Sequence, residues 1–222
     1  MYINELSLVN FRNYSKFYSD FNGKYNVIYG KNAQGKTNIL EAIFLCSTGR
    51  SHRTRKDTEL INFTEDAFYI KLNVKRKYSD NEIEFYYSKF DGKKIKINNL
   101  PVKKSVELMG KLNTVMFSPE DLSIIKGSPS ERRRFIDIAI SQIKPSYFYN
   151  LQKYTKILSQ RNHLLKDISK NRKLEGTLEI WNESLADTGA KIIVERKSFI
   201  ENLNKIVKKK HEELTAENEN LN

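Results

Sequence analysis

Apolar and polar residues alternate with a period of two over several runs in the first hundred residues. Because successive side chains of a strand point to opposite faces, this period predicts half-buried β-strands. The pair Asp91-Gly92, which separates two of these runs, is a tight-turn signal and predicts a hairpin. We therefore expect an antiparallel meander around one helix in this part of the chain. The alternating runs and the other extended segments are 2–9, 17–21, 68–75, 83–87 and 95–97.

Two shorter apolar runs predict additional strands. Residues 26–29 (Asn-Val-Ile-Tyr) predict a short buried strand, and residues 113–117 predict a further strand just before a helical region. Residues 38–45 have the apolar spacing of an amphipathic helix. The order strand 26–29, loop, helix 38–45 is the local arrangement from which phosphate-binding loops are built.

Helical periodicity replaces the alternation in the second half of the chain. Pro119 followed by two acidic residues is a helix start, and residues 128–131 (Ser-Pro-Ser-Glu) form a capping box with Pro at the first helical position. Two long heptad-spaced helices then flank a polar turn at 169–177, which predicts an antiparallel helical hairpin. A plain packed helical subdomain explains the same pattern equally well. The polar tail 212–222 is expected to fray.

Residues 30–37 match the phosphate-binding pattern G-x-x-x-x-G-K-T. Backbone N–H groups of such a loop and the positive end of the following helix dipole converge on one spot and hold phosphate. Gly30 and Gly35 permit loop torsions that a Cβ would obstruct, Lys36 would neutralise the β- and γ-phosphates, and the Thr37 hydroxyl would ligate Mg²⁺. A chance glycine turn is the alternative, and the flanking strand and helix argue against it. The predicted nucleotide-binding residues are Gly30, Lys31, Asn32, Ala33, Gln34, Gly35, Lys36 and Thr37.

The charge balance suggests a polyanionic partner. The chain has 222 residues, 39 Lys and Arg against 27 Asp and Glu, and a formal net charge of +12. Such an excess favours nucleic acid or a membrane surface, although an A/T-rich genome would also enrich Lys and Asn. The one cysteine, Cys46, is predicted to be a small buried residue of a protein in the reducing cytosol. No apolar run approaches the length of a membrane span, so we expect a cytoplasmic protein.

Three basic positions could contact phosphate. Arg12 follows the first strand and could reach a nucleotide, or could belong to an ordinary exposed turn. Residues 50–56 form a dense basic run past the loop helix, and such runs are usually solvated faces. Three arginines lie at the start of the capped helix, where positive charge interacts unfavourably with the helix dipole. Binding of an acidic partner would explain why they occur there. The DNA-binding candidates are Arg53, Arg55, Lys56, Arg132, Arg133 and Arg134.

Residues for hydrolysis are harder to find than residues for binding. A hydrolysing phosphate-loop enzyme has a second apolar strand that ends in an Asp for Mg²⁺, called the Walker B motif. The runs 60–63 and 113–117 end in Thr64 and Ser118, and no Leu-Ser-Gly-Gly-type signature loop occurs. The three His residues are dispersed, and the sequence has no His or Cys cluster with metal-ligand spacing. The sequence therefore predicts phosphate binding and assigns no catalytic residue.

These motifs together resemble the RecF family, bacterial recombination mediators related to the SMC and double-strand-break-repair ATPases. The segments that carry the resemblance are 6–14, 30–43, 51–54, 117–122, 126–129 and 132–137. The run Phe-Ser-Pro-Glu-Asp-Leu at 117–122, followed by Arg-Arg-Arg-Phe at 132–135, is far more specific to this family than the nucleotide motif.

The resemblance implies an α/β P-loop head of the ABC/SMC-like class, with a mixed sheet, an antiparallel meander and an α-helical lobe with a helical hairpin. The ATP-binding lobe is expected over 1–120 and the helical lobe over 121–222. By the family motif, residues 30–37 cradle ATP with Mg²⁺ and Arg12 lies near the nucleotide. Residues 117–121 occupy the place of the cassette's Q-loop, but no Gln stands there, and Glu120 is the residue of this segment that could contact metal and water.

Family members bind single-stranded or gapped DNA, pair as ATP-dependent homodimers, and load RecA together with RecO and RecR. The likeness covers about the first three-fifths of the family, so we expect a truncated or split form, lacking the signature and Walker B motifs, that hydrolyses little ATP alone. A second hypothesis is an SMC-like head that acts as a structural or protein-docking module. A small kinase is a third, but no catalytic lid or base is apparent for it.

Overall fold

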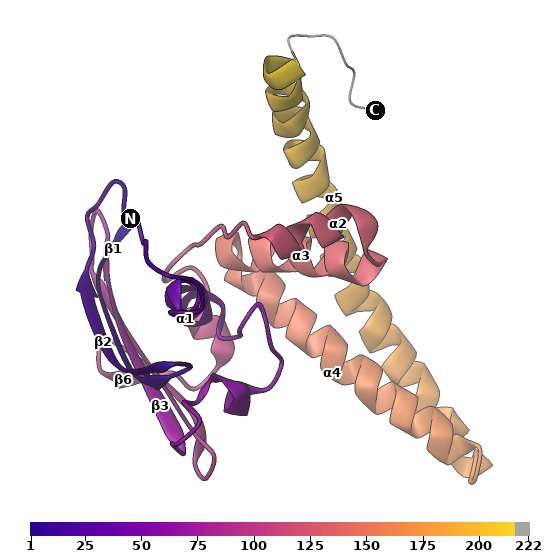
Figure 1. Cartoon of the computed structure of the whole chain (residues 1–222). Coiled ribbons are helices and arrows are strands. Elements are labelled where there is room, and N and C mark those ends of the chain that lie inside the picture. The colour runs from indigo at the N-terminus through magenta and orange to yellow at the C-terminus, as the bar shows by residue number, and fades with distance from the viewer. Residues whose placement is uncertain (216–222) are drawn as a thin grey trace. The chain divides into compact units, whose positions relative to one another are not determined.

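The computed structural model describes residues 1–215, apart from the side chains at 120, 122 and 123. The chain divides into two compact units at the boundary between residues 118 and 119. The first unit combines one sheet with one α-helix, and the second unit is helical (Figure 1).

The first unit is built on a six-stranded sheet in the order β2-β1-β3-β4-β5-β6, in which every pairing is antiparallel. The predicted meander and the Asp91-Gly92 hairpin are confirmed, because β3, β4 and β5 pair in sequence order and Gly92 pairs with Ser88 at the turn. The non-local pairing of β1 with β3 places Leu6 opposite Leu72. The strands are β1 Tyr2–Phe11, β2 Tyr14–Asp20, β3 Ala67–Lys75, β4 Asn81–Ser88, β5 Gly92–Ile97 and β6 Leu100–Pro101.

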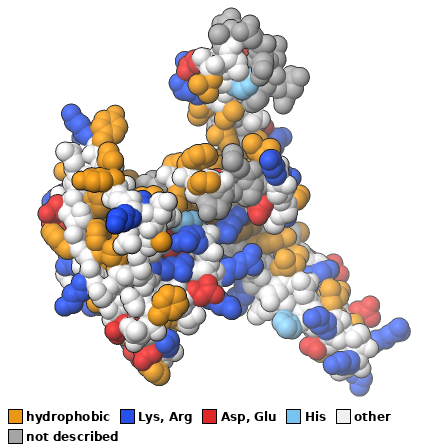
Figure 2. Space-filling view, viewed as in Figure 1, with side chains coloured by type: hydrophobic (Ala, Val, Ile, Leu, Met, Phe, Trp, Pro, Cys, Tyr) orange, Lys and Arg blue, Asp and Glu red, His pale blue; other side chains and the backbone are white. Residues whose placement is uncertain are grey.

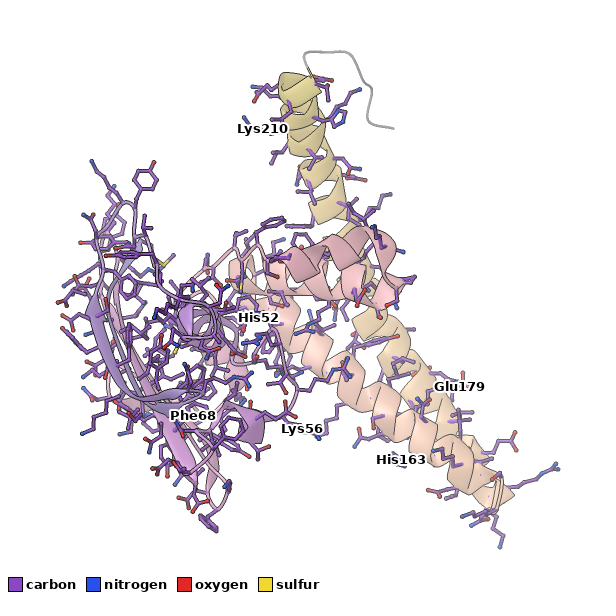
Figure 3. The ribbon with its side chains drawn as sticks, in the orientation of Figure 1. His52, Lys56, Phe68, His163, Glu179 and Lys210 are labelled. Atoms are coloured by element: carbon purple, nitrogen blue, oxygen red, sulfur yellow. The ribbon has the colours of Figure 1, made fainter. Side chains whose placement is uncertain are left out.

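Helix α1, Lys36–Thr48, covers one face of this sheet (Figure 1). Alternate strand residues such as Ile70 and Leu72 are fully buried beneath it together with Leu45, as expected from the period of two. Cys46 is also fully buried, which confirms that it is a small buried residue. Phe68 lies in the same core, stacked on Phe85 with ring centroids 5.9 Å apart (Figure 3). Two short 3₁₀ helices, η1 Asp57–Leu60 and η2 Ser105–Leu108, complete the unit.

The predictions of strands at 26–29 and 113–117 are wrong. Neither segment is a strand, and neither is buried as a whole: Val27 is 84% exposed, Tyr29 91% and Val115 98%. A strand needs a neighbour to satisfy its N–H and C=O groups, and the sheet of the described residues leaves both segments without one. The sheet is therefore antiparallel throughout rather than mixed in this part of the chain.

The second unit consists of helices, and the expected hairpin is confirmed. Helices α4 and α5 run side by side in opposite directions (Figure 1), so closely that a Cβ at Gly189 of α5 would lie 3.3 Å from the Tyr154 ring of α4. Of the predicted fraying tail, 212–215 belong to α5 and the rest lies outside the described residues. The elements are η3 Pro119–Leu122, α2 Ser123–Lys126, α3 Pro129–Ile143, α4 Pro145–Ile168, η4 Arg172–Thr177 and α5 Leu178–Thr215.

A partly buried ion pair joins three of these helices. Asp137 of α3 accepts two hydrogen bonds from the Arg196 guanidinium of α5, both at 2.9 Å, and one from the Tyr147 hydroxyl of α4. The side chain of Tyr147 also packs with Ile140 and Ile192 in a buried apolar cluster of this unit. Over residues 1–215, no helix combines the length and the apolar character that crossing a membrane requires.

Candidate nucleotide-binding site

The loop of residues 30–35 has the backbone that a phosphate cradle needs. Gly30 and Gly35 have φ values of +148° and +96°, in the region that favours glycine. Gly35 directly precedes α1, and a Cβ there would lie 2.5 Å from Oδ1 of Asn13. The loop therefore runs straight into the first turn of α1, and the turn after β1 packs against its last residue.

Lys36 folds back over this loop. Its ammonium group donates to the carbonyl oxygens of Gly30 at 2.8 Å and Lys31 at 2.7 Å. The positive charge thus lies inside the curve of the loop, next to the N-terminus of α1, and both favour an anion. Thr37, the predicted Mg²⁺ ligand, is exposed at the same helix end.

The buried carboxylate of Glu41, on α1 after the loop, forms ion pairs with two arginines. Glu41, one turn after Thr37 on α1, has no exposed surface. Its oxygens accept hydrogen bonds from Nε of Arg12 at 3.0 Å and from its terminal nitrogen at 2.7 Å. Ser51 donates to the same carboxylate at 2.5 Å, and Arg53 approaches it at 3.5 Å.

Several polar side chains connect this carboxylate to the loop. Arg53 donates to Asn38 at 3.0 Å, and Asn38 donates to Asn13, the residue that contacts Gly35, at 2.8 Å. Burial of Glu41 would by itself raise its pKa, but the hydrogen bonds from Arg12 and Ser51 and the charges of Arg12 and Arg53 outweigh burial and lower it. Glu41 is therefore held as an anion between two cations.

The predicted site residues fall into separate groups. Residues 30–37 and Arg12 come together in the first unit, and the side chain of Arg12 is only 20% exposed rather than part of an open turn. Arg53 joins the same network, whereas Arg55 and Lys56 are exposed beyond α1, where Figure 3 labels His52 and Lys56. The ring of His52 packs edge-on against Phe44, with centroids 5.5 Å apart.

The arginines that open α3 belong to the second unit. Arg132 donates to the carbonyls of Ile124 and Gly127 at 3.3 and 3.1 Å, so it has a structural purpose that the sequence did not indicate. Arg133 and Arg134 are exposed. Figure 2 shows Lys and Arg side chains on the visible face of both units, in keeping with the net charge of +12. The side chain of Glu120 lies outside the described residues.

The sequence reasoning missed Glu41, Asn38 and Ser51 as members of the site. Glu41 stands in the apolar run 39–45 at the i+4 position from Thr37, and a charge at such a position is a signal for a buried ion pair. That signal names no partner, because Arg12 lies 29 residues away in sequence.

Comparison with known proteins identifies the family. The model of a family described as "AAA domain" matches residues 5–222. The chain belongs to the AAA domain family. It is also 52% identical over 215 residues to the DNA replication and repair protein RecF of Acetivibrio thermocellus, covering 97% of this chain and 58% of that protein. The RecF protein of Ruminiclostridium cellulolyticum is 50% identical over 222 residues, covering 100% and 60%.

Solved structures agree with this assignment. The recombination mediator protein RecF with ATP, from the RecFOR pathway, has a TM-score of 0.92 and 44% identity over 97% of this chain and 58% of that one. An SMC ATPase has a TM-score of 0.50 at 22% identity, over 62% of this chain and 99% of that one, and shows the fold alone. The resemblance to RecF and the α/β P-loop head of the ABC/SMC-like class are confirmed. The chain spans about three-fifths of the length of these RecF relatives.

Proposed function

We propose that this chain binds ATP with Mg²⁺ at residues 30–37, as part of a DNA replication and repair protein of the RecF type. The observation that carries the proposal is the Lys36 ammonium held inside a glycine loop at the N-terminus of α1. The exposed Thr37 hydroxyl is the proposed Mg²⁺ ligand, and Arg12 flanks the loop. A solved RecF relative is described with ATP, which supports the same ligand here.

Calorimetry with ATP and Mg²⁺ on this chain and on Lys36→Ala tests nucleotide binding. We expect binding in the wild type and its loss in the variant, because the loop then lacks the ammonium group that lies inside its curve and would neutralise the β- and γ-phosphates. Lys24→Ala, which removes an exposed positive charge preceding the loop, is the matched control and should bind as the wild type does. Equal binding by all three proteins would contradict the proposed site.

The proposal extends to DNA. We infer that phosphates of single-stranded or gapped DNA are contacted by Arg53, Arg55 and Lys56 of the first unit, and by Arg132, Arg133 and Arg134 of the second unit. The same proposal includes four further properties. The protein works with RecO and RecR to load RecA, and it pairs as an ATP-dependent homodimer. It is located in the cytoplasm and hydrolyses ATP weakly. These properties are supported by the RecF relatives and by the RecFOR pathway named for one of them.

Electrophoretic mobility shifts at several salt concentrations test the DNA proposal. Each phosphate neutralised by Lys or Arg releases counterions, so affinity should fall steeply as salt rises, and Arg55→Gln should reduce that slope by about one. Preference for gapped DNA over blunt duplex separates repair-type binding from a protein-docking head. Salt-insensitive binding would contradict the electrostatic contacts.

A further inference from the structure

The conformation of Arg12 is unusual for its residue type. It occupies the tight turn between β1 and β2, where Phe11 pairs with Tyr14, and its φ is +55°. Glycine and asparagine adopt this left-handed region with little strain, whereas a long side chain does so at a cost. A turn alone would favour Gly or Asn at this position. We therefore infer that interactions of the Arg12 guanidinium offset the backbone strain.

Glu41 fixes where that side chain lies. The guanidinium uses Nε and one terminal nitrogen on the carboxylate, and its other terminal nitrogen donates to the carbonyl of Glu59 at 2.8 Å. An arginine has five N–H groups. Two of them therefore have no partner within the described part of the chain, one on each terminal nitrogen.

The turn that carries Arg12 packs against the phosphate loop. Asn13, the chain neighbour of Arg12, is in contact range of Gly35, and it also accepts from Asn38 in the first turn of α1. Glu41 itself is one helical turn from Thr37. One carboxylate also faces a second arginine, Arg53, so the cluster keeps a net positive charge that suits an anion.

We propose that Glu41 is a positioning residue for the nucleotide site, which holds Arg12 so that its two remaining N–H groups meet a phosphate oxygen of bound ATP. This inference rests on the proposed function. Glu41 makes no contact with the nucleotide, and it acts through the placement and the charge of Arg12. A flexible arginine on this turn would have to be ordered when ATP binds, whereas the arginine held by Glu41 is already in place.

A double-mutant cycle on the full chain tests this inference, with a fluorescent ATP analogue as the probe. We expect Glu41→Gln to weaken binding about tenfold, the loss of one charge-assisted contact, and Arg12→Ala to do the same. The double variant should bind ATP no more weakly than Arg12→Ala, because Glu41 affects ATP affinity only through Arg12. Additive losses would mean that Glu41 acts by another route, and would overturn the inference.

Two comparisons separate positioning from a general loss of stability. Asp137→Asn removes a carboxylate that is also bound by an arginine through two hydrogen bonds, but in the other unit, and ATP affinity should be unchanged. Glu41→Asp keeps the charge on a shorter side chain and should recover part of the affinity; it carries the test if Glu41→Gln does not fold. Wild-type affinity in both Glu41 variants would overturn the inference.

The same titrations test the proposed function separately. Binding that is lost in Lys36→Ala but unchanged by the Glu41 variants would leave the nucleotide site standing and overturn only the inference about Glu41. Absence of binding in the wild type would overturn both.

Discussion

Glu41 is a charged side chain without exposed surface, a state that costs free energy unless protein groups replace the lost water. Two arginines and one serine do so here, and they hold its pKa below the ordinary value of 4.5. A carboxyl whose folded-state pKa is lowered stabilises the folded state above its unfolded pKa. That contribution disappears as the pH falls through the folded-state pKa.

We therefore expect Glu41→Gln to flatten the acid side of the stability profile. In urea unfolding from about pH 6 to about pH 3, the wild type should lose more of its free energy of unfolding than the variant does, because only the wild type has this carboxylate to protonate. Equal losses in both proteins would show that the ion pair with Arg12 contributes nothing to folding.

Gly35 combines a left-handed backbone with a crowded site. Alanine at this position would adopt φ +96° and place its Cβ 2.5 Å from Asn13 and 2.9 Å from Tyr14, so we expect Gly35→Ala to lower the free energy of unfolding by about 2 kcal/mol or more. Gly92→Ala has the strain without the crowding and should cost about 1 kcal/mol. Gly176→Ala has neither and should be close to neutral. Equal effects at Gly35 and Gly92 would show that the contact with Asn13 relaxes without cost.

At the scale of elements, helices and strands differ in what they need from the rest of the protein. A helix closes its hydrogen bonds within itself, and α1, α3, α4 and α5 all form where the periodicity predicts them. A strand depends on a neighbour, and 26–29 and 113–117 have strand-like composition but no neighbour in the sheet of the described residues. Their residue types favour strands, and the lack of a hydrogen-bonding neighbour explains why neither segment forms one.

Arg196 links α5 to α3 and α4, and its removal should weaken the helical unit. Arg196→Met leaves Asp137 partly buried without its cation, so we expect a loss of about 3 kcal/mol in the free energy of unfolding. Lys191→Met, which removes a cation from an exposed pair with Asp187 on the same helix, should leave the free energy of unfolding nearly unchanged. Similar effects of both changes would indicate that the pair between α3 and α5 is solvated in solution.

At the scale of the whole molecule, the two units have cores of different size. The buried apolar cluster of the first unit draws on four strands and α1, whereas the buried apolar cluster of the helical unit consists of Ile140, Tyr147 and Ile192. Since stability follows buried apolar area, we expect calorimetry to show two thermal transitions, the helical unit melting first. Arg196→Met should lower only the first transition and Gly35→Ala only the second. A single transition that both variants shift equally would mean that the units unfold together.

The sequence by itself determined the elements whose contacts are local. The phosphate loop, its two glycines, the β3–β4–β5 meander and the helical hairpin are encoded within short windows, because their turns, caps and periodicities involve near neighbours. The motifs of the RecF family were likewise visible as short runs of residues. From these windows the candidate site could be predicted as far as residues 30–37, whereas the prediction for Arg12 came from the resemblance to the RecF family.

Only the tertiary structure decided which distant side chains meet. It buried Glu41, brought Arg12, Ser51 and Arg53 to it, and gave Arg132 carbonyl partners. It also decided that 26–29 does not join the sheet. These outcomes depend on groups far apart in the chain. A buried charge is stable only beside a partner of opposite charge, and a strand forms only beside a hydrogen-bonding neighbour, and folding decides whether either partner is present.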